Sequence, residues 1–141
     1  MAKNKRPTKR YTPKPVEIPI TSGLRDELAA YTHFSLMSME YGEVSVEAWK
    51  KIAKVVMTVS FATDGVTTVD KADKVAIDSA VLTLKAISDR EVRTGKWYAS
   101  QFDIESLRRG VTAADKVVPA LTYSTLKRGY IAFVTLIRTI K

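Results

Sequence analysis

Apolar and small residues recur with a helical period along residues 69–93. They fall in steps of three and four, at Val69, Ala72, Val75, Ala76, Ser79, Ala80, Leu82, Thr83, Ala86 and Ile87. This spacing predicts one face of an α-helix. The face is rich in Ala, Ser and Thr, and such small side chains allow other helices to approach the backbone closely. We therefore expect this helix to form the centre of a helical bundle.

Four more amphipathic segments are predicted to be helices, namely residues 22–40, 45–62, 103–118 and 123–140. The second is nearly all apolar or small from Val55 to Phe61, so it should be well buried. In the last helix the residues expected to point inward are Leu126, Tyr130, Phe133, Ile137 and Ile140. Five helices joined by short loops, with no strand pattern that outcompetes them, predict an all-α fold, a four- to five-helix bundle.

Local signals predict how the central helix begins and ends. Thr67 or Thr68 is expected to cap its first turn, and Gly95 to close its last turn. Asp70 and Lys74 are spaced to form an ion pair along its surface.

Two similar stretches carry a glycine after a basic pair. They are SLRRGV at residues 106–111 and TLKRGY at residues 125–130. If the last two helices form a hairpin about Pro119, both basic pairs would lie along one side of it. Gly110 and Gly129 would then be points of close packing between helices, each at a cost of roughly 1 kcal/mol in helix propensity.

The chain divides into a tail and a single domain. Residues 1–20 contain four prolines and little to bury, so we expect a flexible, extended basic tail. Residues 21–141 are long enough for one core. The absence of cysteine excludes disulfides and thiolate metal sites. No apolar run approaches the ~18 residues of a membrane span, and no apolar segment of a secretory signal follows the first cations. These features predict a cytoplasmic protein with no membrane contact.

Charge is distributed unevenly along the chain. Residues 1–16 hold six cations and no acid, residues 17–107 hold ten cations and fourteen acids, and residues 108–141 hold seven cations and one acid. The two ends are therefore strongly basic, although the formal net charge is only +8. Such an asymmetry points toward an anionic partner for the ends.

The residues needed for catalysis or for a cofactor are not apparent. His33 is the only histidine, and we interpret it as bonded to a backbone group or a carboxylate. Asp70, Asp73 and Asp78 could bind Mg²⁺, but they alternate with lysines and are better read as ion-paired surface residues. No phosphate loop, dinucleotide motif or nucleophile elbow occurs. We expect a non-enzymatic protein without metal or cofactor, although a pair of carboxylates that meet in space stays open.

Cations interleaved with aromatic residues are the strongest functional signal. The residues predicted to bind nucleic acid or an acidic partner are Lys3, Lys5, Arg6, Lys9, Arg10, Tyr11, Lys14, Arg108, Arg109, Lys127 and Arg128. The cations would neutralise phosphates, and Tyr11 would stack on an unpaired base. Trp97 and Tyr98 are either partner anchors or, as we favour, a plug at one end of the bundle.

Two functions compete on these observations. The first is a small binding protein that engages DNA or RNA, or an assembly containing it, mainly through phosphate contacts. The second is a protein–protein interaction module, such as an adaptor, inhibitor or assembly subunit, whose tail docks on an acidic protein. Either is compatible with a homo-oligomer.

Overall fold

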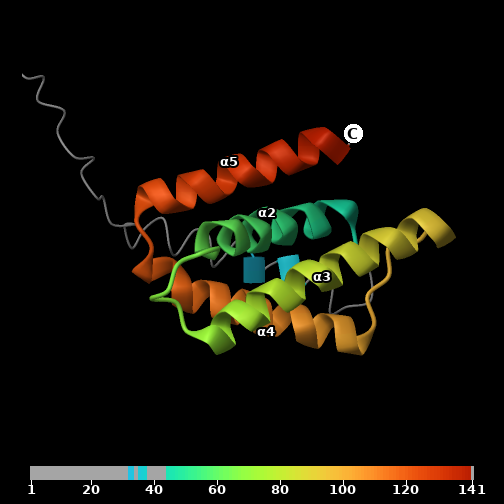
Figure 1. Ribbon diagram of the computed structural model, residues 1–141. Helices are drawn as coiled ribbons and strands as arrows, with labels where there is room; N and C mark the ends of the chain where they lie inside the picture. The colour runs from blue at the N-terminus through green and yellow to red at the C-terminus, as the bar shows by residue number, and fades with distance from the viewer. Residues whose placement is uncertain (1–31, 34, 38–43, 141) are drawn as a thin grey trace, which may run out of the picture.

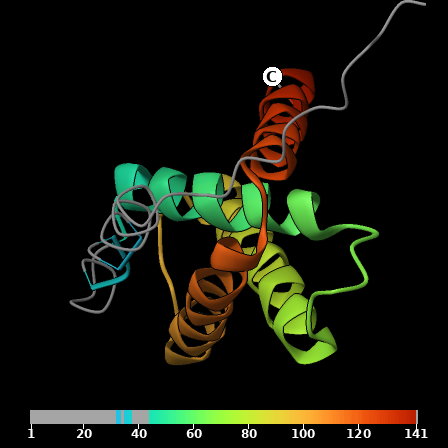
Figure 2. The ribbon, with the colours of Figure 1, turned by 90° about the vertical axis from the view of Figure 1, so that its left-hand side faces the viewer.

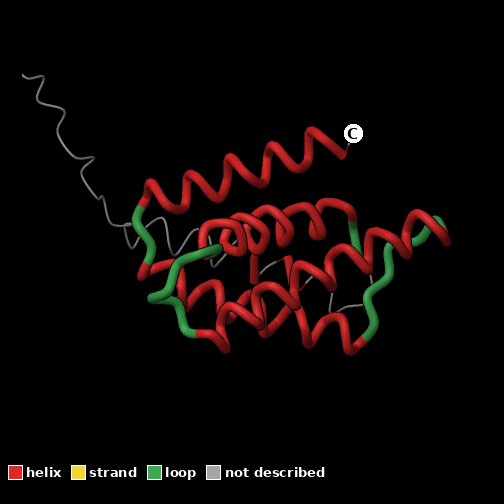
Figure 3. Tube along the Cα trace, viewed as in Figure 1, coloured by secondary structure: helices red, strands yellow, loops and turns green. Residues whose placement is uncertain are grey.

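The computed structural model of the protein describes residues 32–33, 35–37 and 44–140 (Figure 1). They form helices α2 (Val46–Thr63), α3 (Lys71–Thr94), α4 (Gln101–Val117) and α5 (Tyr123–Ile140), with a 3₁₀ turn η1 (Val118–Ala120) between the last two. The described residues contain no strand (Figure 3). The predicted all-α bundle is therefore confirmed.

Helix α2 separates the other helices into two groups. Helices α3 and α4 pack together on one side of it, and α5 packs on the other side (Figures 1 and 2). Ten of the 18 residues of α2 are buried, including the whole run Val55–Val59, against four of the 24 residues of α3. The expectation that residues 69–93 form the centre is thus wrong, because α2 alone is covered from both sides.

The buried face of α3 agrees only in part with the predicted face. The buried residues are Ile77, Ala80, Leu84 and Ile87, of which Ala80 and Ile87 were predicted. Val75 and Leu82, expected inside, are 62% and 66% exposed. Residues 75 and 77 point in nearly opposite directions, since they lie roughly 200° apart around a helix. The helix has apolar stripes on two opposite sides, and because α3 lies at the edge of the bundle, its neighbours cover only one of them.

Side-chain caps set the first residues of the helices. Ser45 caps α2, which therefore begins one residue after the predicted start. Asp70 caps α3 by accepting a hydrogen bond from the Ala72 N–H at 2.8 Å, in place of the predicted Thr67 or Thr68. A reciprocal pair of hydrogen bonds between Ser100 and Asp103 opens α4 two residues earlier than predicted.

Helix ends follow from glycine and proline. Gly95 adopts the left-handed conformation, with φ 74°, and closes α3 as predicted. Pro119 lies in η1, so the α-helix stops there and the chain turns into α5.

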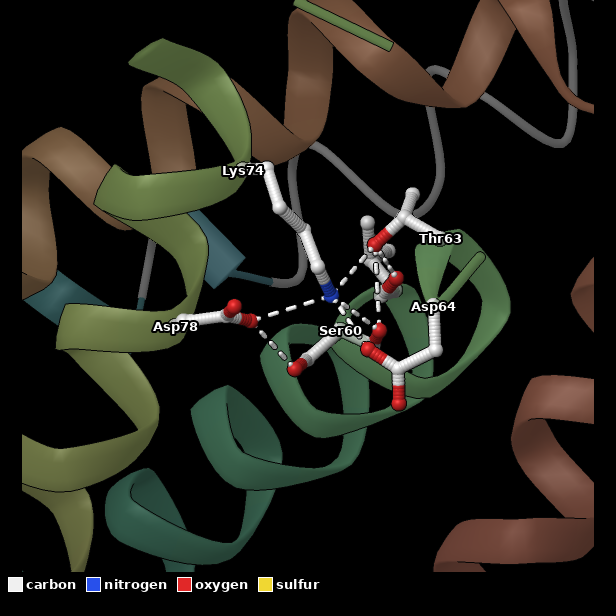
Figure 4. A network of polar contacts seen from close by, with 6 residues as sticks. Ser60, Thr63, Asp64, Lys74 and Asp78 are labelled. Carbon is white, nitrogen blue, oxygen red and sulfur yellow. Dashed lines mark hydrogen bonds and ion pairs between the residues drawn. The ribbon is translucent and has the colours of Figure 1, made fainter. Parts of the chain in front are cut away.

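Lys74 ties the end of α2 to α3 (Figure 4). Its Nζ atom lies 2.6 Å from the Asp64 carboxylate and 3.1 Å from that of Asp78. It also donates to the Ser60 carbonyl oxygen at 2.7 Å and to the Thr63 hydroxyl at 3.0 Å. The predicted partner of Lys74, Asp70, acts instead as the helix cap. A cation near the last carbonyls of α2 satisfies groups that a helix end leaves unpaired.

Both glycines are points of close packing, but each packs on a different helix from the one that the predicted hairpin required. A Cβ atom on Gly110 would lie 2.3 Å from Ala80 Cβ, and one on Gly129 would lie 2.3 Å from the Thr58 carbonyl oxygen. Gly110 therefore allows α4 to approach α3, and Gly129 allows α5 to approach α2. Among the described residues α4 and α5 do not pack along each other, so the hairpin about Pro119 does not form.

Most of the predicted helix over residues 22–40 lies outside the described residues, as does the tail. Residues 32–33 and 35–37 are helical, and Thr32, Ser35 and Leu36 are buried. The His33 ring contacts the Asp115 carboxylate of α4 at 2.5 Å. This pairing confirms the interpretation of His33 as a histidine bonded to a carboxylate.

Candidate nucleic-acid interface

The structure describes only part of the predicted binding set. Tyr11 and the six cations of residues 1–16 lie outside the described residues. The four remaining cations divide between two helices, with Arg108 and Arg109 on α4 and Lys127 and Arg128 on α5. Since these helices pack on opposite sides of α2, the two basic pairs do not combine into one site.

The two basic pairs also differ in their surroundings. Arg108 forms an ion pair with Glu105, one turn earlier on α4, whereas Arg109 is exposed. Lys127 and Arg128 are both exposed on α5, a helix without any acidic residue. The uncompensated charge is therefore greater on α5.

Trp97 and Tyr98 have separate environments. Trp97 is half-buried against the core, with its ring centroid 5.5 Å from that of Trp49. This is the packing expected of a plug at the end of the bundle. Tyr98 is 55% exposed, and the guanidinium group of Arg90 lies 5.7 Å from its ring centroid. Of the two, only Tyr98 has most of its surface accessible to a partner.

The folded domain concentrates positive charge on α2 and α5. These two helices carry six cationic side chains and one acidic side chain, Glu47. Helices α3 and α4 together carry eight cationic and seven acidic side chains. Residues 17–107 have a net negative charge, but the lysines of α2 belong to this segment. Packing α5 on α2 brings the basic residues of α5 beside these lysines. The excess of positive charge therefore lies on this pair of packed helices and not only at the chain ends.

A cation–aromatic contact joins these two helices. The ammonium group of Lys54 on α2 lies 5.6 Å from the ring centroid of Tyr130 on α5. Tyr130 is 41% exposed, which corrects its predicted inward position. Its ring is tilted by 35° against that of Phe133, with centroids 6.3 Å apart. The half-buried Phe133 thereby supports the accessible ring.

Exposed lysines extend this contact along both helices. Lys50 lies one turn before Lys54, and Lys127 one turn before Tyr130, so each projects near its neighbour. We call Lys50, Lys54, Lys127 and Tyr130 the cationic–aromatic surface. Within the described part of the chain, the side chains of Lys50 and Lys127 form no ion pair. The contact between Lys54 and Tyr130 was not predicted, because it depends on how α5 is placed over α2.

The remaining polar clusters act within the fold. Lys116 forms an ion pair with Asp73 at 3.4 Å, while Asp70 and Asp78 have the partners described above. Burial alone would raise the pKa of Asp103, but hydrogen bonds from Ser100 and the ion pair with Arg90 hold this pKa below its usual value. Among the described residues no three His, Cys, Asp or Glu side chains gather in a way that could hold a metal ion.

No helix in the described ranges has both the length and the apolar character to cross a membrane. Comparison of this chain with protein-family models, with curated proteins and with solved structures returned no match.

Proposed function

We propose that this protein is a non-enzymatic nucleic-acid-binding protein that contacts phosphates through the cationic–aromatic surface and the basic amino-terminal tail. The observation that supports it most directly is the contact between the Lys54 ammonium group and the accessible ring of Tyr130. Exposed lysines, Lys50 and Lys127, lie one turn before these two residues. Lysine side chains neutralise phosphates and release condensed counterions, which favours binding to any nucleic acid.

The aromatic ring favours single strands over duplex. An accessible tyrosine among cations provides a face on which an unpaired base can stack, worth about 1–3 kcal/mol per base. The bases of a duplex are already stacked on each other, so Tyr130 has no equivalent partner there. No pattern of side chains suited to reading base edges is needed for this mode, and we propose little dependence on sequence.

The experiment is fluorescence anisotropy with a labelled single strand and the matching duplex over a range of salt concentrations. The double variant Lys54→Glu/Lys127→Glu should weaken binding to both probes strongly. Lys96→Glu is the matched control for charge, since Lys96 is exposed in the loop between α3 and α4 and is not part of the cationic–aromatic surface.

A second pair of variants tests the ring. Tyr130→Ala should weaken single-strand binding about tenfold, the equivalent of 1.4 kcal/mol, and Tyr130→Phe should retain most of it. Duplex binding should change little in either variant. If the full-length protein binds neither probe at low salt, the proposal fails and an acidic protein partner becomes the better hypothesis.

A further inference from the structure

Helix α3 carries an apolar stripe on the side opposite the core. It consists of Ala72, Val75, Ser79, Leu82 and Ala86, and all five residues are exposed. The steps of three, four, three and four residues are those of the a and d positions of a coiled coil. Leu82 and Val75 are among the most exposed large apolar residues of the described chain. A helix of this kind that is apolar on two opposite sides has a second packing surface.

We propose that two copies of this chain associate through the α3 stripe, with the two α3 helices antiparallel. In this register Ser79 faces Leu82 of the second copy, and Val75 faces Ala86 of the second copy. A two-fold axis repeats both contacts. Each of these layers pairs a small side chain with a large one, which allows close packing without collisions. In the same register Ala72 faces Asp89 of the second copy. The stripe is therefore complementary in size to itself when one copy is inverted.

Charge beside the stripe favours the same arrangement. Asp78 and Lys85 lie one heptad apart along the edge of the stripe. Lys85 is exposed, and the Asp78 side chain is 48% exposed, with its Oδ1 atom alone in contact with Ser60 and Lys74 of the same copy. In the antiparallel register Asp78 faces Lys85 of the second copy, and the two-fold axis forms this pair twice. A parallel pair would instead place Asp89 against Asp89 of the second copy. Like charges in these positions disfavour the parallel arrangement.

The first experiment uses sedimentation to measure the molecular mass that the full-length protein has in solution, over a range of protein concentrations. We expect a dimer in equilibrium with monomer. Leu82→Glu should shift this equilibrium to monomer. The matched control is Ile131→Glu, because Ile131 is 55% exposed on α5 and lies outside the stripe. It should leave the dimer unchanged. Circular dichroism and thermal melting establish that each variant is folded.

The second experiment reads the direction of the helices. The chain contains no cysteine, so single cysteines report only the designed contacts. A mixture of the Val75→Cys variant and the Ala86→Cys variant should form a disulfide-linked heterodimer under mild oxidation. Val75→Cys alone should not link efficiently, because the two copies of residue 75 would lie roughly 16 Å apart along the helices, beyond the ~7 Å reach between Cα atoms of a disulfide.

Three results would overturn the proposal. One is a monomer at every concentration, and another is a dimer that Leu82→Glu leaves intact. The third is a Val75→Cys protein that links to itself more readily than to Ala86→Cys, which would require a parallel pair. Lys85→Glu gives an independent check, since it places two acids together and should weaken the dimer. The proposal concerns α3 alone and stands apart from nucleic-acid binding by α2 and α5.

Discussion

Gly110 of α4 lies against Ala80 of α3 so closely that a Cβ atom on Gly110 would be 2.3 Å from Ala80 Cβ. Such a distance is well inside the ~3.5–4.0 Å contact distance of two carbon atoms. Ala80 is fully buried and has no side-chain torsion that could move its methyl group. The two helices can approach this closely because residue 110 has no side chain and residue 80 has only a methyl group.

Gly110→Ala should destabilise the protein by about 1–3 kcal/mol, as overpacking does in other cores. Alanine favours a helix over glycine by roughly 1 kcal/mol, so propensity alone predicts the opposite sign. The steric term should win because neither methyl group can rotate away. The measurement is the midpoint of urea unfolding.

Ala80→Gly in the same chain provides the control for this interpretation. If the clash causes the loss, Gly110→Ala/Ala80→Gly should be more stable than the sum of the two single changes predicts. Strict additivity would mean that the two positions do not interact.

Lys74→Met should lower the free energy of unfolding by about 1–3 kcal/mol. The change keeps the length of the side chain but leaves the Ser60 carbonyl oxygen and the carboxylates of Asp64 and Asp78 without their shared cation. Lys71→Met is the matched control, because Lys71 is exposed on the same helix. Equal effects of the two substitutions on chemical unfolding would contradict the role assigned to Lys74.

Asp103→Asn should lower stability near neutral pH by about 1–3 kcal/mol, because Arg90 loses a charged partner. The pKa of Asp103 in the folded protein is below its usual value. As the pH falls, residue 103 of the unfolded chain therefore takes up a proton at a pH of about 4. In the folded protein the same carboxylate takes up its proton only at a lower pH. The stability difference between the native protein and the variant should then shrink below that pH. A difference that stays constant in urea titrations from pH 7 to about 3 would exclude this linkage.

Deletion of residues 1–16 should reduce the salt dependence of nucleic-acid binding without lowering the melting temperature of the domain. If about four to six tail cations reach phosphates, the full chain should show a slope of log K against log salt that is steeper by about 4–5 units. The comparison is made on one duplex at several salt concentrations. Identical slopes for the two proteins would remove the tail from the proposed binding mode.

Local sequence determined which segments are helical. The periodicity of residues 45–62 and 123–140 predicted α2 and α5 within one residue at each end, and Gly95 marked the end of α3. These features depend on hydrogen bonds and steric limits within a few residues, so the sequence contains them directly.

Tertiary structure decided which faces are covered and which charges lie together. Periodicity showed that α3 is amphipathic, but only its position at the edge of the bundle selected Ile77 and Leu84 for the core and left Val75 and Leu82 exposed. The contact between Lys54 and Tyr130 joins residues far apart in the chain. Both outcomes depend on the choice of partner for each helix, which is set by the packing of all helices at once and leaves no local pattern in the sequence.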